Sequence, residues 1–165
     1  MTDVEIIPAA AADVSVLRHL MQLYLYDLAT LEGWDIGNDG AFGNAERIER
    51  FWSEPARWSF LIKVAGTLAG FALVRKGSDF SGEATEMSEF FVLARYRRRG
   101  IGRHAATAVF ARFPGTWEVK QLDWNHPAQS FWRSVIARYT ANHFEEFRTS
   151  HEGQNYVVHR FTVPK

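Results

Sequence analysis

The sequence predicts an α/β fold, in which a single-domain mixed β-sheet over residues 1–165 is flanked by helices. Helix-like apolar periodicity alternates with short apolar runs typical of strands, in the order β-α-α-β-β-β-α-β-α-β-β. Some neighbouring runs are separated by short turn signals, which indicate antiparallel hairpins, whereas strand–helix–strand units favour parallel neighbours. The sheet is therefore expected to contain both kinds of pairing.

The first third of the chain is predicted to hold one strand and two helices. Residues 4–8 form a short apolar strand, and Asp13 opens a helix whose apolar residues recur at spacings of three and four. This stripe consists of Val14, Leu17, Met21, Tyr24 and Leu28. Residues 32–43 are rich in Gly, Asn and Asp and predict a loop. Asn44 is expected to cap a second helix over residues 45–52.

The middle third is predicted to hold three strands. The apolar runs 58–64 and 68–74 are joined by Ala65-Gly66-Thr67, which indicates a hairpin. A second turn over residues 77–82 follows, and residues 84–93 predict a longer strand.

The last third alternates helix and strand and ends in a hairpin. The predicted elements are a helix over 101–113, a strand over 116–122, a helix over 127–138, and strands over 140–148 and 156–163. Pro114-Gly115 stops the first of these helices, and His151-Glu152-Gly153 supplies the final turn.

Composition excludes several classes of function. The 19 Lys and Arg residues balance the 19 Asp and Glu residues, which argues against a general nucleic-acid or membrane-surface binder. The chain has no cysteine, so disulfides, thiolate metal sites and a Cys nucleophile are excluded. Its six histidines are scattered, and no metal site is predicted. The first residues lack the pattern of a signal peptide, and we expect a cytoplasmic protein.

The most informative segment is the basic turn between the strand over 84–93 and the helix that follows. Gly100 and Gly102 remove side chains where the turn enters the helix, so backbone N–H groups are open to a ligand. The turn and its helix also contain Arg97, Arg98, Arg99 and Arg103. A tight turn with a solvated basic edge would need the same glycines. Four crowded arginines in a neutral chain, however, favour a site for a pyrophosphate.

This segment resembles the signature of the Gcn5-related N-acetyltransferase (GNAT) superfamily, Arg/Gln-x-x-Gly-x-Gly/Ala. Arg97-Arg98-Arg99-Gly100-Ile101-Gly102 matches it position by position. A second family element, an Asn that leads a helix with Ala and two large residues, is similar to Asn125 through Trp132. The order of predicted elements agrees with the family fold over essentially the whole chain, which is thus identified as one N-acetyltransferase domain.

The resemblance implies a site for acetyl-CoA as co-substrate. Its pyrophosphate would contact the turn, its pantetheine arm would pair with the strand edge like an added strand, and an N–H near Val92 would polarise the thioester carbonyl. The implied cofactor-binding residues are Phe91, Val92, Leu93, Arg97, Arg98, Arg99, Gly100, Ile101, Gly102, Arg103, Asn125 and Phe131. The reaction would be direct attack by a primary amine of a small molecule or protein.

Direct attack requires a base, and Glu86 and Glu89 are the candidates on the central strand. Their odd spacing places them on opposite faces of a regular strand, so only one would face the pocket unless a bulge intervenes. Many relatives donate a proton to the thiolate from a tyrosine at the position of Trp132, and an indole cannot replace that acid. Neither Tyr96 nor Tyr139 has the expected position, so water is the remaining donor.

Three functions stay open at this point. The first is the N-acetyltransferase, with an acceptor that Tyr24, Tyr26, Asp27, Glu32 and Trp34 would bind if it is cationic. The second is a non-catalytic acyl-CoA sensor on the same fold, motivated by Trp132. The third is nucleic-acid binding through residues 95–103, against which the neutral net charge counts. The aromatic content is compatible with a homodimer, but the sequence does not locate its interface.

Overall fold

A seven-stranded mixed sheet organises residues 3–43 and 46–165, the part of the chain that the computed structural model describes. The strands are β1 (Val4–Pro8), β2 (Arg57–Val64), β3 (Thr67–Lys76), β4 (Thr85–Val92), β5 (Gly115–Leu122), β6 (Phe144–His151) and β7 (Gln154–Val163). The α-helices are α1 (Val14–Glu32), α2 (Glu46–Ser53), α3 (Ile101–Phe110) and α4 (His126–Tyr139). Two short 3-10 helices are η1 (Ala11–Asp13) and η2 (Ala94–Tyr96). This order confirms the predicted one.

The strands lie in the order β1-β2-β3-β4-β5-β7-β6. All neighbours are antiparallel except β4 and β5, which are parallel and connected through α3. The prediction of a mixed sheet is therefore confirmed, and the single parallel pair lies at its centre.

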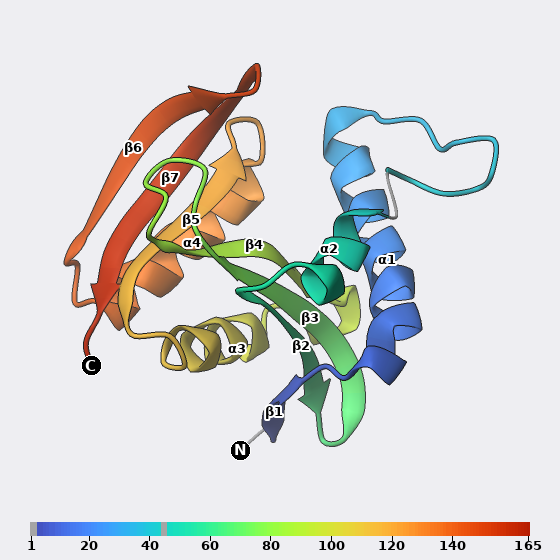
Figure 1. Cartoon of the computed structure of the whole chain (residues 1–165), viewed down its shortest axis with the longest axis horizontal. Helices are drawn as coiled ribbons and strands as arrows, with labels where there is room; N and C mark the ends of the chain where they lie inside the picture. Colours follow the sequence, from blue (N-terminus) through green and yellow to red (C-terminus); the bar gives the residue numbers. More distant parts are fainter. Residues whose placement is uncertain (1–2, 44–45) are drawn as a thin grey trace.

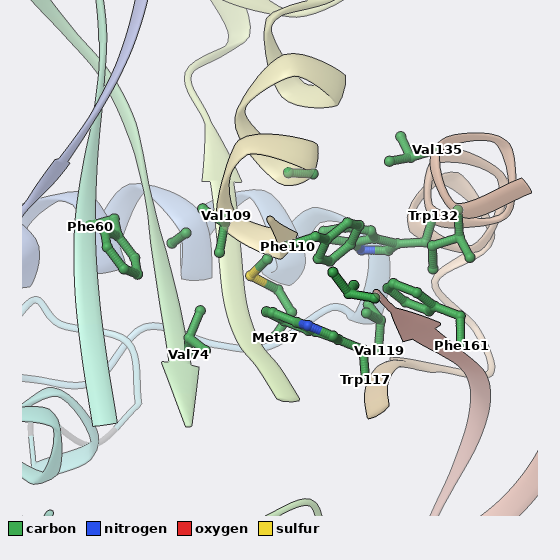
Figure 2. Close-up of a cluster of buried hydrophobic side chains, with 14 residues drawn as sticks. Phe60, Val74, Met87, Val109, Phe110, Trp117, Val119, Trp132, Val135 and Phe161 are labelled. Carbon is green, nitrogen blue, oxygen red and sulfur yellow. The ribbon is translucent and has the colours of Figure 1, made fainter. Parts of the chain in front are cut away.

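Helices cover both faces of the sheet (Figure 1). On one face, α1 and α2 pack on β2, β3 and β4 through an apolar cluster that includes Leu17, Phe51 and Phe71. On the other face, α3 and α4 pack on an aromatic cluster in which Phe110 and Trp132 lie beside Phe161 (Figure 2). No helix in the two described ranges is long and apolar enough to cross a bilayer.

Several element boundaries differ from the predicted ones. Helix α3 ends at Phe110 rather than at residue 113, because a turn over the next residues precedes Pro114. The last hairpin closes at Glu152-Gly153, both in the left-handed region with φ of 49° and 77°, so β6 reaches His151 and β7 begins at Gln154. Asn44 and Ala45, the predicted cap and first residue of the second helix, lie outside the described residues.

The central parallel pair is short. Only Thr85 and Glu86 of β4 pair with β5, opposite Trp117 and Glu118. Beyond these residues β4 continues to pair with β3 on one side, whereas its other side loses its partner strand. The two halves of the sheet diverge from this point (Figure 1). An unpaired strand edge therefore opens in the middle of the sheet rather than at its border.

Two irregularities shape the diverging end of β4. Leu73 pairs with Glu89 while Val74 pairs with Met87, so Ser88 is the extra residue of a β-bulge. Nearer the end of the strand, Gly70 lies opposite Val92 in the register. A Cβ atom at position 70 would lie 2.0 Å from the carbonyl oxygen of Phe91. Only glycine therefore allows β3 and β4 to approach this closely.

We expect Gly70→Ala to lower the free energy of unfolding by about 1–3 kcal/mol, the usual cost of overpacking. The added methyl group must displace the Phe91 carbonyl and thus the open end of β4. Gly66→Ala is the control, because its methyl group would meet no atom within 4 Å and its cost comes only from the φ of 74°. Urea denaturation measures both variants. A smaller loss at position 70 than at position 66 would contradict this account of the close approach.

Candidate functional site

The open edge of β4 presents a defined set of backbone groups. Leu93 donates its N–H to the Ala69 carbonyl at 2.8 Å, and hydrogen-bonded residues alternate along an antiparallel pair. The backbone groups of Leu93 and Phe91 therefore point toward β3. Those of Val92 and Phe90 point to the opposite side, where β5 has already diverged. Of the predicted contact residues on this edge, Val92 has its N–H on the open side.

The side chain of Arg97 points back to the end of β4 and to α1 rather than toward the turn that follows. Its Nε donates to the Val92 carbonyl at 2.7 Å, and its guanidinium lies 5.4 Å from the centre of the Phe91 ring. The same guanidinium forms an ion pair with Asp27 of α1. The Arg97 side chain, predicted from sequence to contact the cofactor, is thus bound to the end of β4 and to α1.

The turn itself is shaped for an anion. Arg98 and Gly100 are left-handed, with φ of 59° and 77°, and left-handed residues that alternate with ordinary ones direct successive N–H groups to one side. Within the described chain, none of the backbone N–H groups of residues 98–103 donates to a protein acceptor. A non-glycine residue in this conformation is strained, and such strain is concentrated at functional sites.

Positive charge accompanies these free donors. Arg98, Arg99 and Arg103 are exposed, and none of them forms an ion pair with a carboxylate among the residues described. Arg99 and Arg103 also line a groove of about 600 Å³ that begins at the turn and continues between α3 and α4. Arg138 extends its positive lining, and His104 also lies along it. Free N–H groups, a helix N-terminus and guanidinium groups without carboxylate partners are chemically suited to a phosphate-containing ligand.

The remaining predicted cofactor contacts lie near this turn. Asn125 caps α4, because its Oδ1 accepts from the Ala128 N–H at 3.2 Å. The Phe131 ring stacks on Phe90 at 5.9 Å between ring centres. A Cβ atom at Gly102 would lie 3.2 Å from the Phe131 ring. The second glycine of the motif therefore allows α3 and α4 to approach each other, and Ile101 is buried beneath them.

The bulge at Ser88 brings the two candidate bases to the same face of the sheet. Glu86 pairs with Arg75 and Glu89 with Leu73, and these partners are two residues apart on β3, so they share a face. The expectation that the glutamates occupy opposite faces holds only for a regular strand and is wrong here. Both side chains are buried, with exposed fractions of 2% for Glu86 and 7% for Glu89.

The surroundings of the two glutamates differ. Both carboxylate oxygens of Glu86 accept hydrogen bonds from the Arg75 guanidinium at 3.0 Å, and the Lys120 ammonium lies 3.7 Å away. Glu86 therefore belongs to an ion-pair network at the point where β4 and β5 part. Glu89 lies beyond that point, along the stretch of β4 that has no partner on its second side.

Asp79 is the second carboxylate of this network. It pairs with Arg75 at 2.5 Å and with Lys120. Although burial acts in the opposite direction, the hydrogen bonds from Lys120 and Arg75 lower the pKa of Asp79 to about 2. The neighbouring Glu118 is neutralised separately by Arg160 at 2.7 Å. The buried charges at the junction are thus matched by cations, as burial requires.

Trp132 occupies the place of a proton donor in the family motif, but its indole is in the hydrophobic core. Figure 2 shows it beside Phe110, and the two ring centres are 6.1 Å apart. Tyr139 packs on Phe110 at 5.5 Å, and burial raises the pKa of its hydroxyl. Tyr96 is buried against α3. These side chains therefore stabilise the fold around the site.

Sequence reasoning missed two contributors to this region. Phe90 supplies backbone groups to the open edge and a ring to Phe131, and Gly70 permits the close approach of β3 and β4. Asp27 was predicted as a contact for a cationic acceptor, whereas its carboxylate forms an ion pair with Arg97. A glycine inside an apolar strand was the available signal for Gly70. No local pattern indicated the pairing of Asp27 with Arg97, because the two residues are 70 positions apart.

Comparison with known families tests this description. A family model described as the acetyltransferase (GNAT) family matches residues 20–135, which is most of the chain. The chain belongs to the GNAT family. The matched range includes most of α1, the open strand, the basic turn and most of α4, so the resemblance seen in the motif is confirmed. A search of curated proteins finds no match.

Solved structures of GNAT proteins share the fold at low sequence identity. A GNAT-family acetyltransferase from Streptococcus agalactiae has a TM-score of 0.75 at 12% identity, over 98% of this chain and 96% of that one. The ribosomal-protein-S18-alanine N-acetyltransferase from Escherichia coli has a TM-score of 0.62 at 15% identity, over 99% and 96%. A spermidine/spermine N-acetyltransferase from Vibrio cholerae has a TM-score of 0.61 at 10% identity, over 96% and 92%.

We expect the Asp79 network to make the stability of this GNAT protein depend on acid pH. A carboxyl group whose folded pKa of about 2 lies below the ordinary value of 3.8 stabilises the fold above pH 4, and this contribution is lost as pH falls through 2. Asp79→Asn should lower the free energy of unfolding by up to about 2 kcal/mol at pH 6 and by much less near pH 2. Urea denaturation at several pH values measures the difference.

Asp35→Asn is the control for this experiment, because Asp35 is exposed on the loop after α1 and the charge change is the same. An equal loss for the two variants, or a loss at position 79 that does not depend on pH, would contradict the network.

Proposed function

We propose that this GNAT-family chain is an acetyl-CoA-dependent N-acetyltransferase that transfers an acetyl group to a primary amine of a small molecule or protein. The observation that carries the proposal is the turn over residues 98–103. Its unused N–H groups and unpaired arginines stand directly beside the open edge of β4. These features match a ligand that joins a diphosphate to an amide-containing arm, as CoA does. The proposal includes a cytoplasmic location.

Binding would use the turn and the strand edge together. The N–H groups of residues 98–103 would donate to the diphosphate, and Arg98, Arg99 and Arg103 would neutralise its charge. The groove between α3 and α4 would hold the nucleotide, with Arg138 as a further cation. The amides of the pantetheine arm would pair with the open edge of β4, to which the backbone groups of Phe90 point, and lie near Asn125 and Phe131.

The reaction would be direct attack. The amine nitrogen forms a bond with the carbonyl carbon of the thioester, the carbon–sulfur bond breaks, and the sulfur leaves as a thiolate. Negative charge that develops on the carbonyl oxygen would be stabilised by the Val92 N–H, which is fixed before the reaction begins. A fixed donor of this kind costs little reorganisation.

Glu89 is the better candidate for the base. Glu86 uses both carboxylate oxygens to bind Arg75, whereas Glu89 is buried beside the open stretch of β4. Glu89 would accept the proton that the amine releases. Since Trp132 is held in the core, water would donate the proton that the thiolate takes up.

The acceptor would approach from the side of α1 and the loop that follows it. Residues 27–43 contain four acidic residues and no basic one, which favours a cationic amine. Ribosomal-protein alanine and the polyamines spermidine and spermine are acceptors of the proteins named above, so GNAT folds of this kind serve both protein and small-molecule amines. The second candidate function is a non-catalytic acyl-CoA sensor, which the burial of Trp132 favours.

Charge reversal of the turn tests the cofactor site. Arg98→Glu, Arg99→Glu and Arg103→Glu should each weaken CoA binding about tenfold or more, because each removes a charge-assisted contact. Isothermal titration calorimetry measures the dissociation constant. Arg148→Glu on the exposed strand β6 carries the same charge change and should bind CoA as the wild type does. Undiminished binding by all three turn variants would remove the basis of the proposal.

Glu89→Gln tests catalysis. We expect kcat to fall about 100-fold or more with the affinity for CoA unchanged, since general-base catalysis contributes at least this factor. Thiol release during turnover of a panel of amines measures the rate. Glu86→Gln is the matched variant and should lower stability through loss of its contacts with Arg75. Full activity of Glu89→Gln would exclude this residue as the base, and absence of turnover with every amine would favour the sensor.

A further inference from the structure

The guanidinium of Arg97 joins three parts of the molecule that lie far apart in the sequence. It donates to the Val92 carbonyl at 2.7 Å, lies 5.4 Å from the centre of the Phe91 ring and forms an ion pair with Asp27. Val92 and Phe91 end the open strand, whereas Asp27 belongs to α1. The first arginine of the family motif thus connects the cofactor strand with the helix on the acceptor side.

The carbonyl oxygen of Val92 lies where its partial negative charge would act on the thioester oxygen. It points to the open side of β4, together with the Val92 N–H that would stabilise charge on the thioester oxygen. If the Val92 carbonyl accepted no hydrogen bond, its oxygen would repel the oxygen of the thioester. Arg97 donates a hydrogen bond to this carbonyl and adds a positive charge beside it. The Val92 N–H then remains as the donor at this end of the strand.

Asp27 determines where the Arg97 guanidinium lies. Without a carboxylate on α1, a flexible arginine four residues before the helix would be drawn to the diphosphate with its neighbours Arg98 and Arg99. The α1 helix is itself attached to the strand end, because Tyr24 packs on Phe91 at 5.7 Å between ring centres. The position of α1 and the position of the Val92 peptide are therefore coupled.

We infer that Asp27 and Arg97 are a positioning pair, which orients the end of β4 for the thioester and couples it to the acceptor-side helix. This inference rests on the proposed function. Arg97 therefore has a different role from the neighbouring arginines. Arg98, Arg99 and Arg103 bind the cofactor charge, whereas Arg97 acts through Val92. The ion pair is largely exposed, at 43% for Arg97 and 39% for Asp27, so it contributes little to stability.

The experiment compares two ligands that differ only in the acetyl group. Calorimetry gives the dissociation constants of acetyl-CoA and CoA for the wild type, Asp27→Asn, Arg97→Lys and the double variant. In each single variant we expect the affinity for acetyl-CoA to fall about fivefold and that for CoA to change less than twofold. The double variant should lose no more affinity for acetyl-CoA than each single variant, because the two substitutions remove the same contact. Asp27→Glu should restore most of the affinity.

Glu49→Gln is the matched control. It breaks the ion pair between Arg18 of α1 and Glu49 of α2, which has a similar exposure of 48% and 44%. This variant should leave both dissociation constants unchanged, and thermal denaturation verifies that each variant is folded. With an amine that the wild type acetylates, Asp27→Asn and Arg97→Lys should each lower kcat about tenfold and change the KM for acetyl-CoA little.

Other results would overturn the inference. Equal losses of affinity for acetyl-CoA and CoA would show that Arg97 binds the charge of the cofactor directly. A loss in Arg97→Lys without a loss in Asp27→Asn would show that the two residues do not act as a pair. Unchanged affinities in both variants would exclude positioning. Each of these leaves the proposed function intact, whereas a wild type that binds neither nucleotide would remove the proposed function and this inference with it.

Discussion

The parting of β4 from β5 is the constraint on which the rest of this structure depends. Two parallel strands that remained paired along their full length would satisfy each other's backbone groups and leave no edge for a ligand. Here the pairing with β5 stops after Glu86 and Glu118, and beyond them β4 pairs with β3 alone among the described strands. Because the edge lies in the middle of the sheet, helices on both faces protect it from pairing with other chains.

Charge and backbone geometry determine where the strands separate. The last pair places two buried carboxylates, Glu86 and Glu118, on adjacent strands, and each has its own guanidinium, from Arg75 and Arg160. Buried carboxylates without such partners would be strongly unfavourable. Beyond the pair, the bulge at Ser88 and the close approach at Gly70 turn the end of β4 toward β3 and away from β5.

Adjacent residues of the arginine-rich turn differ in their backbone conformation and in the groups that they contact. Arg98 adopts a left-handed conformation that exposes N–H groups, while Arg97, one residue earlier, is extended and directs its side chain back to the strand. Gly100 is favoured by its φ of 77°, whereas at Gly102 a Cβ atom would lie 3.2 Å from the Phe131 ring and the ring would have to shift slightly. A single short motif thus combines exposed backbone N–H groups, proposed to contact the cofactor, with the packing of α3 against α4 and β4.

The sequence alone determined the order of the elements and the mixed sheet and predicted where an anion would bind, because apolar periodicity, turn residues and the glycine–arginine motif are local signals. Helix ends were placed less accurately, as α3 shows, since its last turn depends on packing before Pro114. Only the tertiary structure decided that Glu86 and Glu89 share a face, because a bulge arises from pairing with β3 and has no local signature. The same reason applies to Arg97, whose side chain binds Val92 and Asp27, partners that only the folded chain brings together.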